Sequence, residues 1–333
     1  MTAHLIKREH REDAPRALFD ASHGQPNWAQ TGFPSRELHT NFAGLTETLC
    51  RLGLECRSTA NQQWPALLPL ARLLVIPPPT GRYDLKRERW KRERSSLITP
   101  AEVCSILSFL ESGGRLLAFA YRFGDSFTQT NLGDLCLALG CRLNDDAVID
   151  VGALRHTDPL HLCFDTPEHA IVLPWARPGV ASVRWRPVAT FTLLPGVRAW
   201  PLALSTGGGC FSFDRTLRRI CFASLPIAVA GRHGLGRFAL FGGPHLFESN
   251  TLGLLTHPDN ARFLRNTLDW LLSDAVDDSV AGQMQAAAAS VTYFPDLSRV
   301  EANAHGERIV TSVERVLRKA GVLKALGRAK WMP

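Results

Sequence analysis

The amino-acid sequence predicts an α/β fold, with a mostly parallel, doubly wound sheet, a β-rich elaboration and a C-terminal helical tail. Short apolar runs that suit buried strands alternate with segments of helical periodicity over residues 16–140. Prolines and short strand-like pieces replace this alternation over residues 141–230, and the strand–helix pattern returns over residues 236–272. Right-handed crossovers in such a fold put helices on both faces of the sheet and polar loops at the carboxyl ends of the strands.

The composition is that of an ordinary globular chain. Of 333 residues, 45% are hydrophobic and 21% are charged, which excludes intrinsically disordered and membrane-embedded classes. The net charge of +7 is a mild excess and does not indicate a nucleic-acid-binding protein. Residues 1–19 carry mixed charges, which argues against a signal peptide. The chain has no apolar run of the length that a transmembrane segment requires, so none is expected. We therefore expect a cytoplasmic protein.

The chain is expected to begin with a flexible segment over residues 1–15, followed by a strand over residues 16–20. The polar residues 21–28 form the loop after that strand. A helix is expected from an N-cap at Ser35 to a stop at Gly53, because apolar side chains recur between them at every third or fourth position.

Two further strands are expected over residues 54–59 and 73–76, the second of them wholly apolar. Residues 82–94 carry many Lys and Arg side chains with two Glu between them, and we interpret this run as a solvated loop or helix face. Thr99, Pro100 and Glu102 combine an N-cap, a proline at the first helical position and an acidic first turn, which predicts a helix that ends at the glycines 113 and 114.

The second half of the domain should repeat the pattern. A strand over residues 116–120 precedes a polar loop over 121–129 and a helix over 131–139. A last strand over residues 236–241 precedes a loop and a helix over 259–272.

The segment after residue 275 is a basic helical tail. Apolar side chains recur there at helical spacing among arginines and a lysine. Such a helix binds a membrane surface or a partner, or docks on its own domain, and docking is the favoured interpretation. Residues 305–331 are the candidate partner helix, and a homodimer is an open alternative.

No familiar nucleotide-binding or metal-binding motif is present. The glycines of residues 231–236 do not have the spacing of a dinucleotide-binding loop, and those of residues 205–210 favour a flexible turn over an anion-binding nest. His156, His161 and His169 match no metal motif. The eight cysteines include no C-x-x-C pair and are interpreted as reduced core thiols. We expect no cofactor and no metal.

The sequence also lacks an obvious catalytic nucleophile. An amidotransferase-like fold would place a cysteine after the strand that ends at Ala120, but the chain continues Tyr121-Arg122-Phe123-Gly124-Asp125. Cys210 and Ser22 are the remaining candidate nucleophiles, with His23, His233 or His245 as candidate bases. An amide or ester hydrolase that uses Cys210 or Ser22 with His23 or His245 is therefore kept as the alternative function.

Four colinear stretches resemble a known family over roughly residues 16–273. They are Leu18-Phe19-Asp20-Ala21-Ser22-His23; Thr130-Asn131-Leu132-Gly133 with Gly140 and Asn144-Asp145-Asp146-Ala147-Val148; Leu204-Ser205-Thr206-Gly207 with Cys210-Phe211; and Gly236-Arg237-Phe238-Ala239-Leu240-Phe241-Gly242 with His245, Phe247, Asp259-Asn260 and Trp270-Leu271. Together they resemble the GIFT domain, which gliding-associated GldG-type proteins share with an intraflagellar-transport subunit of the core B complex. The charged residues 82–94 and the tail after 275 depart from the shared domain.

The resemblance implies a class I glutamine amidotransferase-like fold that lacks the catalytic nucleophile and acts as a ligand-binding or assembly module. It implies one GIFT-like domain over residues 16–274, within which residues 141–230 are the β-rich elaboration. We therefore expect a non-catalytic accessory protein that binds a peptide or protein segment and no nucleic acid.

The binding site is expected at the carboxyl edge of the sheet, where an aromatic anchor and polar side chains meet a ligand carboxylate. The candidate ligand-binding residues are Ser22, His23, Gln25, Asn27, Trp28, Tyr121, Arg122, Thr130, Asn131, Ser205, Thr206 and His245. A peptide that adds to a sheet edge, or a sugar that stacks on Trp28 or Tyr121, are open alternatives.

Overall fold

The computed structural model describes most of the region in which the sequence predicts a domain. The described residues are 15–23, 42–59, 64–84, 89–150, 170–172, 178–180, 183–185, 188–195, 199–205, 210–214, 219–221, 225–248 and 254–274. The expected N-cap Ser35 and the expected tail after residue 275 lie outside them.

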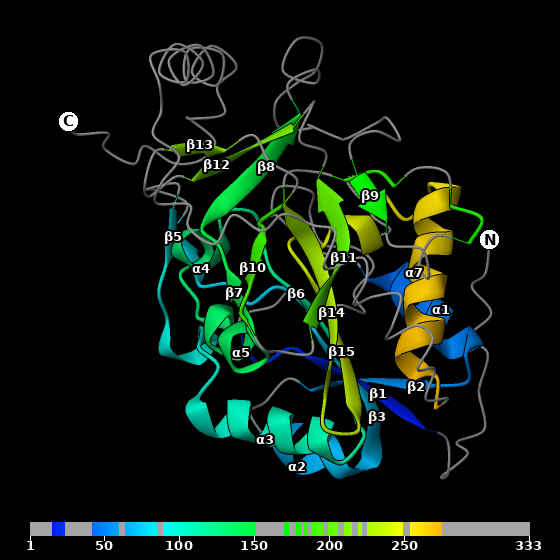
Figure 1. Ribbon diagram of the computed structural model, residues 1–333. Coiled ribbons are helices and arrows are strands. Elements are labelled where there is room, and N and C mark those ends of the chain that lie inside the picture. The colour runs from blue at the N-terminus through cyan, green and yellow to red at the C-terminus, as the bar shows by residue number, and fades with distance from the viewer. Residues whose placement is uncertain are drawn as a thin grey trace, which may run out of the picture.

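A mixed sheet of eight strands forms the centre of the molecule, in the order β2-β1-β3-β6-β15-β14-β11-β9 (Figure 1). Its strands are β1 (Arg16–Asp20), β2 (Glu55–Thr59), β3 (Ala71–Ile76), β6 (Arg115–Phe119), β9 (Ala170–Val172), β11 (Ala199–Ser205), β14 (Pro226–His233) and β15 (Gly236–Phe241). The pairs from β2 to β15 are parallel, and the pairs from β15 to β9 are antiparallel. The strand order reverses between β1 and β3, which is where doubly wound sheets open a crevice for ligands.

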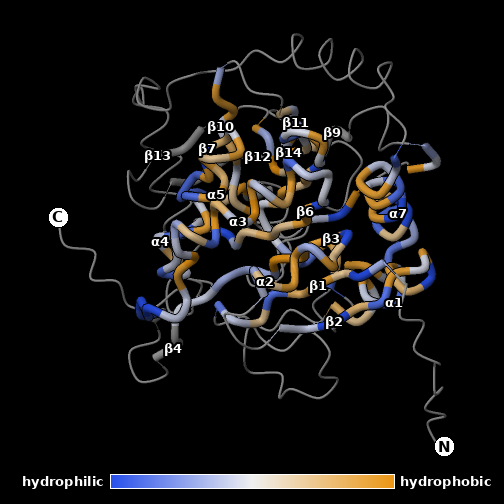
Figure 2. Tube along the Cα trace, turned by 90° about the horizontal axis from the view of Figure 1, so that it is seen from below, coloured by the Kyte–Doolittle hydropathy of each residue, from blue (hydrophilic) through white to orange (hydrophobic). Residues whose placement is uncertain are grey.

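Helices cover both faces of this sheet. α1 (Ala43–Arg51) and α7 (Pro258–Leu272) pack on one face, against Phe19, Phe119 and Phe241. On the other face, the short α2 (Trp64–Leu67) with η1 (Leu68–Leu70), α3 (Pro100–Glu111) and α5 (Leu132–Ala138) pack against a second cluster that includes Leu18 and Leu116. Neighbouring residues of one strand thus belong to opposite clusters, as the pleat requires, and the predicted doubly wound α/β fold is confirmed. Figure 2 shows the hydrophobic residues along the central strands and mixed turns on α7.

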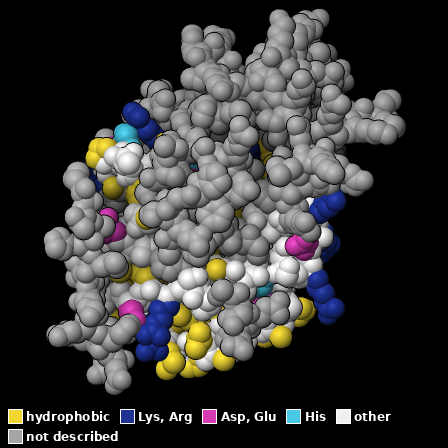
Figure 3. Space-filling view, turned by 180° about the vertical axis from the view of Figure 1, so that it is seen from behind, with side chains coloured by type: hydrophobic (Ala, Val, Ile, Leu, Met, Phe, Trp, Pro, Cys, Tyr) yellow, Lys and Arg dark blue, Asp and Glu magenta, His cyan; other side chains and the backbone are white. Residues whose placement is uncertain are grey.

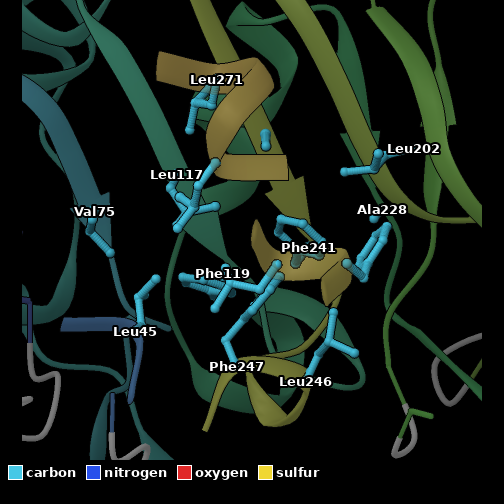
Figure 4. Packing of buried hydrophobic residues seen from close by; sticks show 14 of the residues in the cluster. Leu45, Val75, Leu117, Phe119, Leu202, Ala228, Phe241, Leu246, Phe247 and Leu271 are labelled. Atoms are coloured by element: carbon cyan, nitrogen blue, oxygen red, sulfur yellow. The ribbon is translucent and has the colours of Figure 1, made fainter. Parts of the chain in front are cut away.

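Aromatic rings fill the core next to the end of β15. The ring centroids of Phe241 and Phe247 lie 4.6 Å apart, and both rings contact Phe119 (Figure 4). Phe247 belongs to η5 (His245–Phe247), the turn that follows β15. The core therefore holds this turn in one position relative to the sheet.

The β-rich segment forms two small sheets beside the main one. β7 (Cys141–Leu143) pairs with β10 (Phe191–Leu193), and β12 (Cys210–Asp214) lies between β8 (Asp146–Asp150) and β13 (Arg219–Cys221). The expected β-rich elaboration is present, but β9, β11 and β14 from the same segment belong to the main sheet.

Two expectations about local structure are wrong. The charged run over residues 82–94 contains a hairpin of β4 (Arg82–Asp84) and β5 (Arg89–Lys91), followed by η2 (Arg94–Ser96), where a loop or helix face was expected. The expected exposure to solvent holds for Lys91, Arg92 and Arg94. The polar loop 121–129 contains a short helix, α4 (Gly124–Thr128). The hairpin contacts α4, so the loops after β3 and β6 support each other.

Arginines from three adjacent strands hold the C-terminal end of α7. Arg72 of β3 donates to the carbonyl of Leu272 at 2.7 Å, Arg115 of β6 donates to Ser273, and Arg237 of β15 donates to Trp270. Cations at a helix C-terminus satisfy its last carbonyls and its dipole. These contacts occupy the amino edge of the sheet, where the exposed side chains of Leu67, Leu70 and Leu235 also lie. Figure 3 views the molecule from behind and shows hydrophobic side chains gathered at its lower end.

The cysteines only partly match the expectation of core thiols. Cys136 and Cys141 are buried, Cys50 and Cys56 are partly exposed, and Cys104 is exposed. These five, the cysteines whose side chains are described, form no disulfide. None of the helices in the described part of the chain has the length and apolar character that a bilayer crossing requires.

Candidate functional site

The candidate site is the carboxyl edge of the parallel strands, from which the loops after β1, β6 and β15 emerge. β6 and β15 are neighbours in the sheet, and β3 lies between β1 and β6. β6 pairs with both β3 and β15, and β3 pairs with β1. Loops at the carboxyl ends of parallel strands therefore emerge on the same edge.

The loop after β1 is tied down by a carboxylate at the end of the strand. Oδ1 of Asp20 accepts hydrogen bonds from the backbone N–H of Ser22 at 2.9 Å and from its hydroxyl at 2.5 Å. Oδ2 of Asp20 lies 2.6 Å from Nδ1 of His23. Asp20 and His23 are both fully buried, so these two side chains belong to the core, whereas Ser22 between them is partly exposed.

His23 also faces the first turn of α3. Its Nε2 lies 3.4 Å from Oε2 of Glu102, which forms a capping box with the predicted N-cap Thr99. Thr99 donates to that carboxylate from its backbone N–H at 2.7 Å and from its hydroxyl at 2.8 Å. Trp64 packs against the imidazole with its ring centroid 6.4 Å away. His23 thus connects the end of β1 to the start of α3.

The two carboxylates determine the protonation of His23. Burial by itself lowers the pKa of His23, but the bond to Asp20 and the charges of Asp20 and Glu102 outweigh it, and the pKa is raised above its ordinary value. Burial likewise raises the pKa of Asp20, but His23 and Ser22 outweigh it, and that pKa is lowered. The raised pKa favours the protonated form of His23 between the two acids, which does not suit a general base, and the full burial of His23 does not suit a ligand-facing side chain.

The loop after β6 occupies the place of a nucleophile elbow. Phe123 has a left-handed backbone, with a φ of 63°, and is the N-cap of α4. Its N–H donates to the carbonyl of Asp146 at 2.7 Å, which fixes the turn. A sharp, left-handed strand-to-helix turn is the backbone geometry that presents a nucleophile in hydrolases. Here the turn carries Tyr121, Arg122 and Phe123, with no thiol or hydroxyl suited to nucleophilic attack.

Tyr121 and Arg122 form a stacked group on this turn. The ring of Tyr121 is buried and stacks on Phe127 at 5.9 Å, and the guanidinium of Arg122 lies 5.5 Å from the Tyr121 centroid on its face. The buried ring of Tyr121 leaves no open face for a sugar. Arg122 is partly exposed, but its Nε is buried and has no hydrogen-bond partner among the described residues.

The loop after β15 supplies a histidine and its carboxylate. Nδ1 of His245 lies 2.6 Å from Oε2 of Glu248, whose side chain is fully buried. The ring of His245 lies edge-on to Tyr121, with centroids 5.8 Å apart. The bond to Glu248 occupies Nδ1 and leaves Nε2 as the ring nitrogen that can face a ligand. Oε1 of Glu248 is buried and has no hydrogen-bond partner in the described part of the chain.

The structure brings Tyr121, Arg122 and His245 together, whereas Thr130 and Asn131 form hydrogen bonds to other parts of the protein. Thr130 is buried and donates to Asp125, which caps the start of α5 through the N–H groups of Leu132 and Gly133. The amide of Asn131 pairs with both backbone groups of Ile98. The polar atoms of these two residues join the loops around α3 and α5, and their role in ligand binding stays a prediction.

The other predicted site residues are either buried or outside the described chain. Ser205 is buried at the end of β11, and its hydroxyl accepts a hydrogen bond from the N–H of Leu225 at 3.0 Å. Gln25, Asn27, Trp28 and Thr206 lie outside the described residues. Cys210 begins β12 in a separate sheet from β15, and its side chain is not among those described.

The sequence analysis missed Asp20, Glu102 and Glu248 as partners of the two histidines. A signal was present in the spacing, because Asp20 and His23, like His245 and Glu248, are three residues apart just after a strand. No group of three or more potential metal ligands occurs within the described ranges.

Comparison with known proteins places the fold. No protein-family model matches the chain, and no curated protein sequence matches it. The chain is similar to the solved structure of the mmIFT52 N-terminal domain, with a TM-score of 0.55 and 19% identity over 77% of this chain and 97% of that one. Two Salmonella typhimurium structures are weaker matches: the cytoplasmic protein STM3548 has a TM-score of 0.44 at 16% identity over 77% of this chain and 98% of its own, and STM1381 has 0.43 at 16% over 77% and 99%.

Proposed function

We propose that this chain, which has the GIFT-like fold of the mmIFT52 N-terminal domain, is a non-catalytic module that binds a carboxylate-bearing peptide or protein segment at the carboxyl edge of its sheet. The observation that carries the proposal is the turn after β6. It has the left-handed backbone of a nucleophile elbow but presents an arginine stacked on a buried tyrosine.

The polar atoms at this edge suit a carboxylate ligand. Arg122 offers a guanidinium with a buried N–H that has no partner among the described residues, and guanidinium groups bind carboxylates in a bidentate manner. His245, oriented by Glu248, can accept from or donate to a backbone group of the same segment. A buried polar atom without a partner costs free energy, and a ligand that supplies one recovers it.

Calorimetry with a selected peptide tests this proposal. A phage-displayed peptide library is selected on the full chain, and the best binder is titrated into wild-type protein, Arg122→Ala and the control Arg142→Ala, whose side chain is exposed on β7. Charge-assisted hydrogen bonds contribute about 1.5–3 kcal/mol, so Arg122→Ala should weaken binding about 10- to 100-fold. Equal affinities for the three proteins, or selected peptides without an acidic group, would contradict the proposal.

The hydrolase alternative is supported by one feature, the His245–Glu248 pair, because a carboxylate-oriented imidazole is how hydrolases hold their base. Ser22 and His23 do not form a comparable unit, since Nδ1 of His23 faces both Ser22 and Asp20 and Nε2 faces Glu102. Treatment with a fluorophosphonate and with iodoacetamide distinguishes the functions. Stoichiometric labelling of one residue that His245→Ala abolishes would favour the hydrolase.

The proposed setting is the cytoplasm, where reducing conditions keep buried thiols such as Cys136 and Cys141 reduced. The proposed partner is a peptide or protein segment, in line with an accessory role. A homodimer, or binding of residues 305–331 of this chain at the same edge, would fill the site in the purified protein. The calorimetric titration would then find fewer free binding sites than protein chains.

A further inference from the structure

Two thiols lie together beside the edge strand of the sheet. Cys50 is near the end of α1, Cys56 is the second residue of β2, and their sulfur atoms are 3.9 Å apart. Among the described strands β2 pairs only with β1, so it forms one border of the main sheet as the structure describes it. Five residues separate the two cysteines, and the turn between them passes through Gly53, whose φ is 87°.

Both thiols are accessible to small molecules. Cys50 and Cys56 are partly exposed, and the next residues, Arg51 and Arg57, are exposed. A disulfide requires a sulfur–sulfur distance of about 2.05 Å, so the sulfur atoms must approach by about 1.9 Å. Cys56 also packs against the core, and its thiol donates to the carbonyl of Thr46 at 3.8 Å. Because both cysteines are only partly buried, we expect side-chain rotation that breaks this weak bond, with small backbone shifts, to supply the approach.

A second pair of thiols in the same chain has the opposite character. Cys136 and Cys141 are buried, and the hydrogen bond between them, together with burial, raises the pKa of Cys136 well above its ordinary value. Because the thiolate is the reactive form, Cys136 is protected from oxidants, and the burial of Cys141 beside it limits the access of oxidants to the second thiol. The buried pair is therefore an internal control for the exposed pair.

We propose that Cys50 and Cys56 form a reversible redox site that reacts with small-molecule disulfides. One thiol loses its proton and attacks glutathione disulfide, which forms a mixed disulfide and releases one glutathione thiolate. The second thiol then loses its proton and attacks the protein sulfur of the mixed disulfide, which releases the second glutathione. Two protein thiols are oxidised to one disulfide, and one glutathione disulfide is reduced to two glutathione molecules.

Peptide mapping of the native full chain tests the site. The protein is incubated with glutathione disulfide, remaining thiols are blocked with N-ethylmaleimide, and trypsin is added without a reductant. Trypsin cuts after Arg36, Arg51 and Arg57, so the disulfide joins two peptides, 37–51 and 52–57, that otherwise separate. Cys136 and Cys141 fall within one peptide, 123–142, where a disulfide changes only the mass.

The expected product is the joined pair 37–51 and 52–57, formed at least about tenfold faster than the link within 123–142 because of the difference in exposure. Dithiothreitol should reverse it, and Cys104→Ser should leave it unchanged. Cys56→Ser should abolish it and leave glutathione on Cys50. The proposal would be overturned if both thiols were recovered with N-ethylmaleimide while Cys104 carried glutathione, or if the buried pair reacted as fast.

Discussion

The substitution His23→Gln removes a buried cation from between two acids. His23 is fully buried, its Nδ1 lies 2.6 Å from Oδ2 of Asp20, and its Nε2 lies 3.4 Å from Oε2 of Glu102. Glutamine retains a polar side chain of similar reach, but it carries no charge. Asp20, which is also fully buried, would then be an ionised carboxylate without a counter-charge.

The expected loss of stability is large for one side chain. Removal of one partner from a buried ion pair costs about 3–5 kcal/mol, because the other charge stays buried. The matched control is Arg51→Ala, which breaks the pair with Glu47 on the surface of α1, where both side chains are well exposed. An exposed helix pair contributes only about 0.3–0.5 kcal/mol.

Urea unfolding at neutral pH, followed by circular dichroism, measures both changes in the free energy of unfolding. The double variant Asp20→Asn with His23→Gln should lose less stability than the sum of the two single variants, since it leaves no uncompensated charge. A loss below about 1 kcal/mol for His23→Gln, or strict additivity, would refute the interpretation of His23 as a buried structural cation.

The same groups predict the pH dependence of stability. A raised pKa in the folded state means that the contribution of His23 is fully present below pH 6.5, its ordinary value, and is lost as the pH rises through the folded-state pKa. The lowered pKa of Asp20 means that its contribution is present above pH 3.8 and is lost as the pH falls through the folded-state value. His23→Gln should therefore flatten the alkaline limb of a stability profile measured by urea unfolding.

Three further predictions concern the frame of the site, and urea unfolding measures each. Gly242→Ala should destabilise the chain by more than about 3 kcal/mol or prevent folding, since its Cβ would lie 1.9 Å from the carbonyl oxygen of Ala189; a milder loss would mean that the loop after β15 can move. Gly53→Ala should cost only about 1–2 kcal/mol, because its φ is 87° but no atom lies within 4 Å of the added Cβ; a larger loss would reveal an unseen contact. Asn260→Ala should cost about 2–3 kcal/mol, because it removes hydrogen bonds to the backbone N–H and carbonyl of Arg184; an unchanged stability would show that water replaces both.

The fold was predictable because its signals are local. Gly53, Gly113 and Gly140 end helices at positive φ, as glycine at a helix end predicts, and the capping box at Thr99 and Glu102 starts α3. The residues that carry the family resemblance also act within the fold. Asn131 pairs with the backbone of Ile98, and Asn260 pairs with the backbone of Arg184.

The site was less predictable because its chemistry depends on contacts between distant segments. His23 follows a strand in a polar stretch, which predicted a ligand-facing side chain. In the structure its Nε2 faces the carboxylate of Glu102, which is 79 residues away in the sequence. The hairpin of β4 and β5 was missed because the many charged side chains favoured a solvated loop. The alternation of Arg89 and Lys91 around Trp90, which is typical of a strand, was the weaker signal. The helix α4 was missed because it has only five residues and is flanked by left-handed non-glycine residues.

Hydrogen exchange with the selected peptide bound tests the central claim most directly. The account predicts that amide exchange slows over residues 119–128 and 241–248, at the ends of β6 and β15, and that the peptide is recovered with unchanged mass. Slower exchange confined to the edge strand at residues 55–59, or recovery of a cleaved peptide, would contradict it.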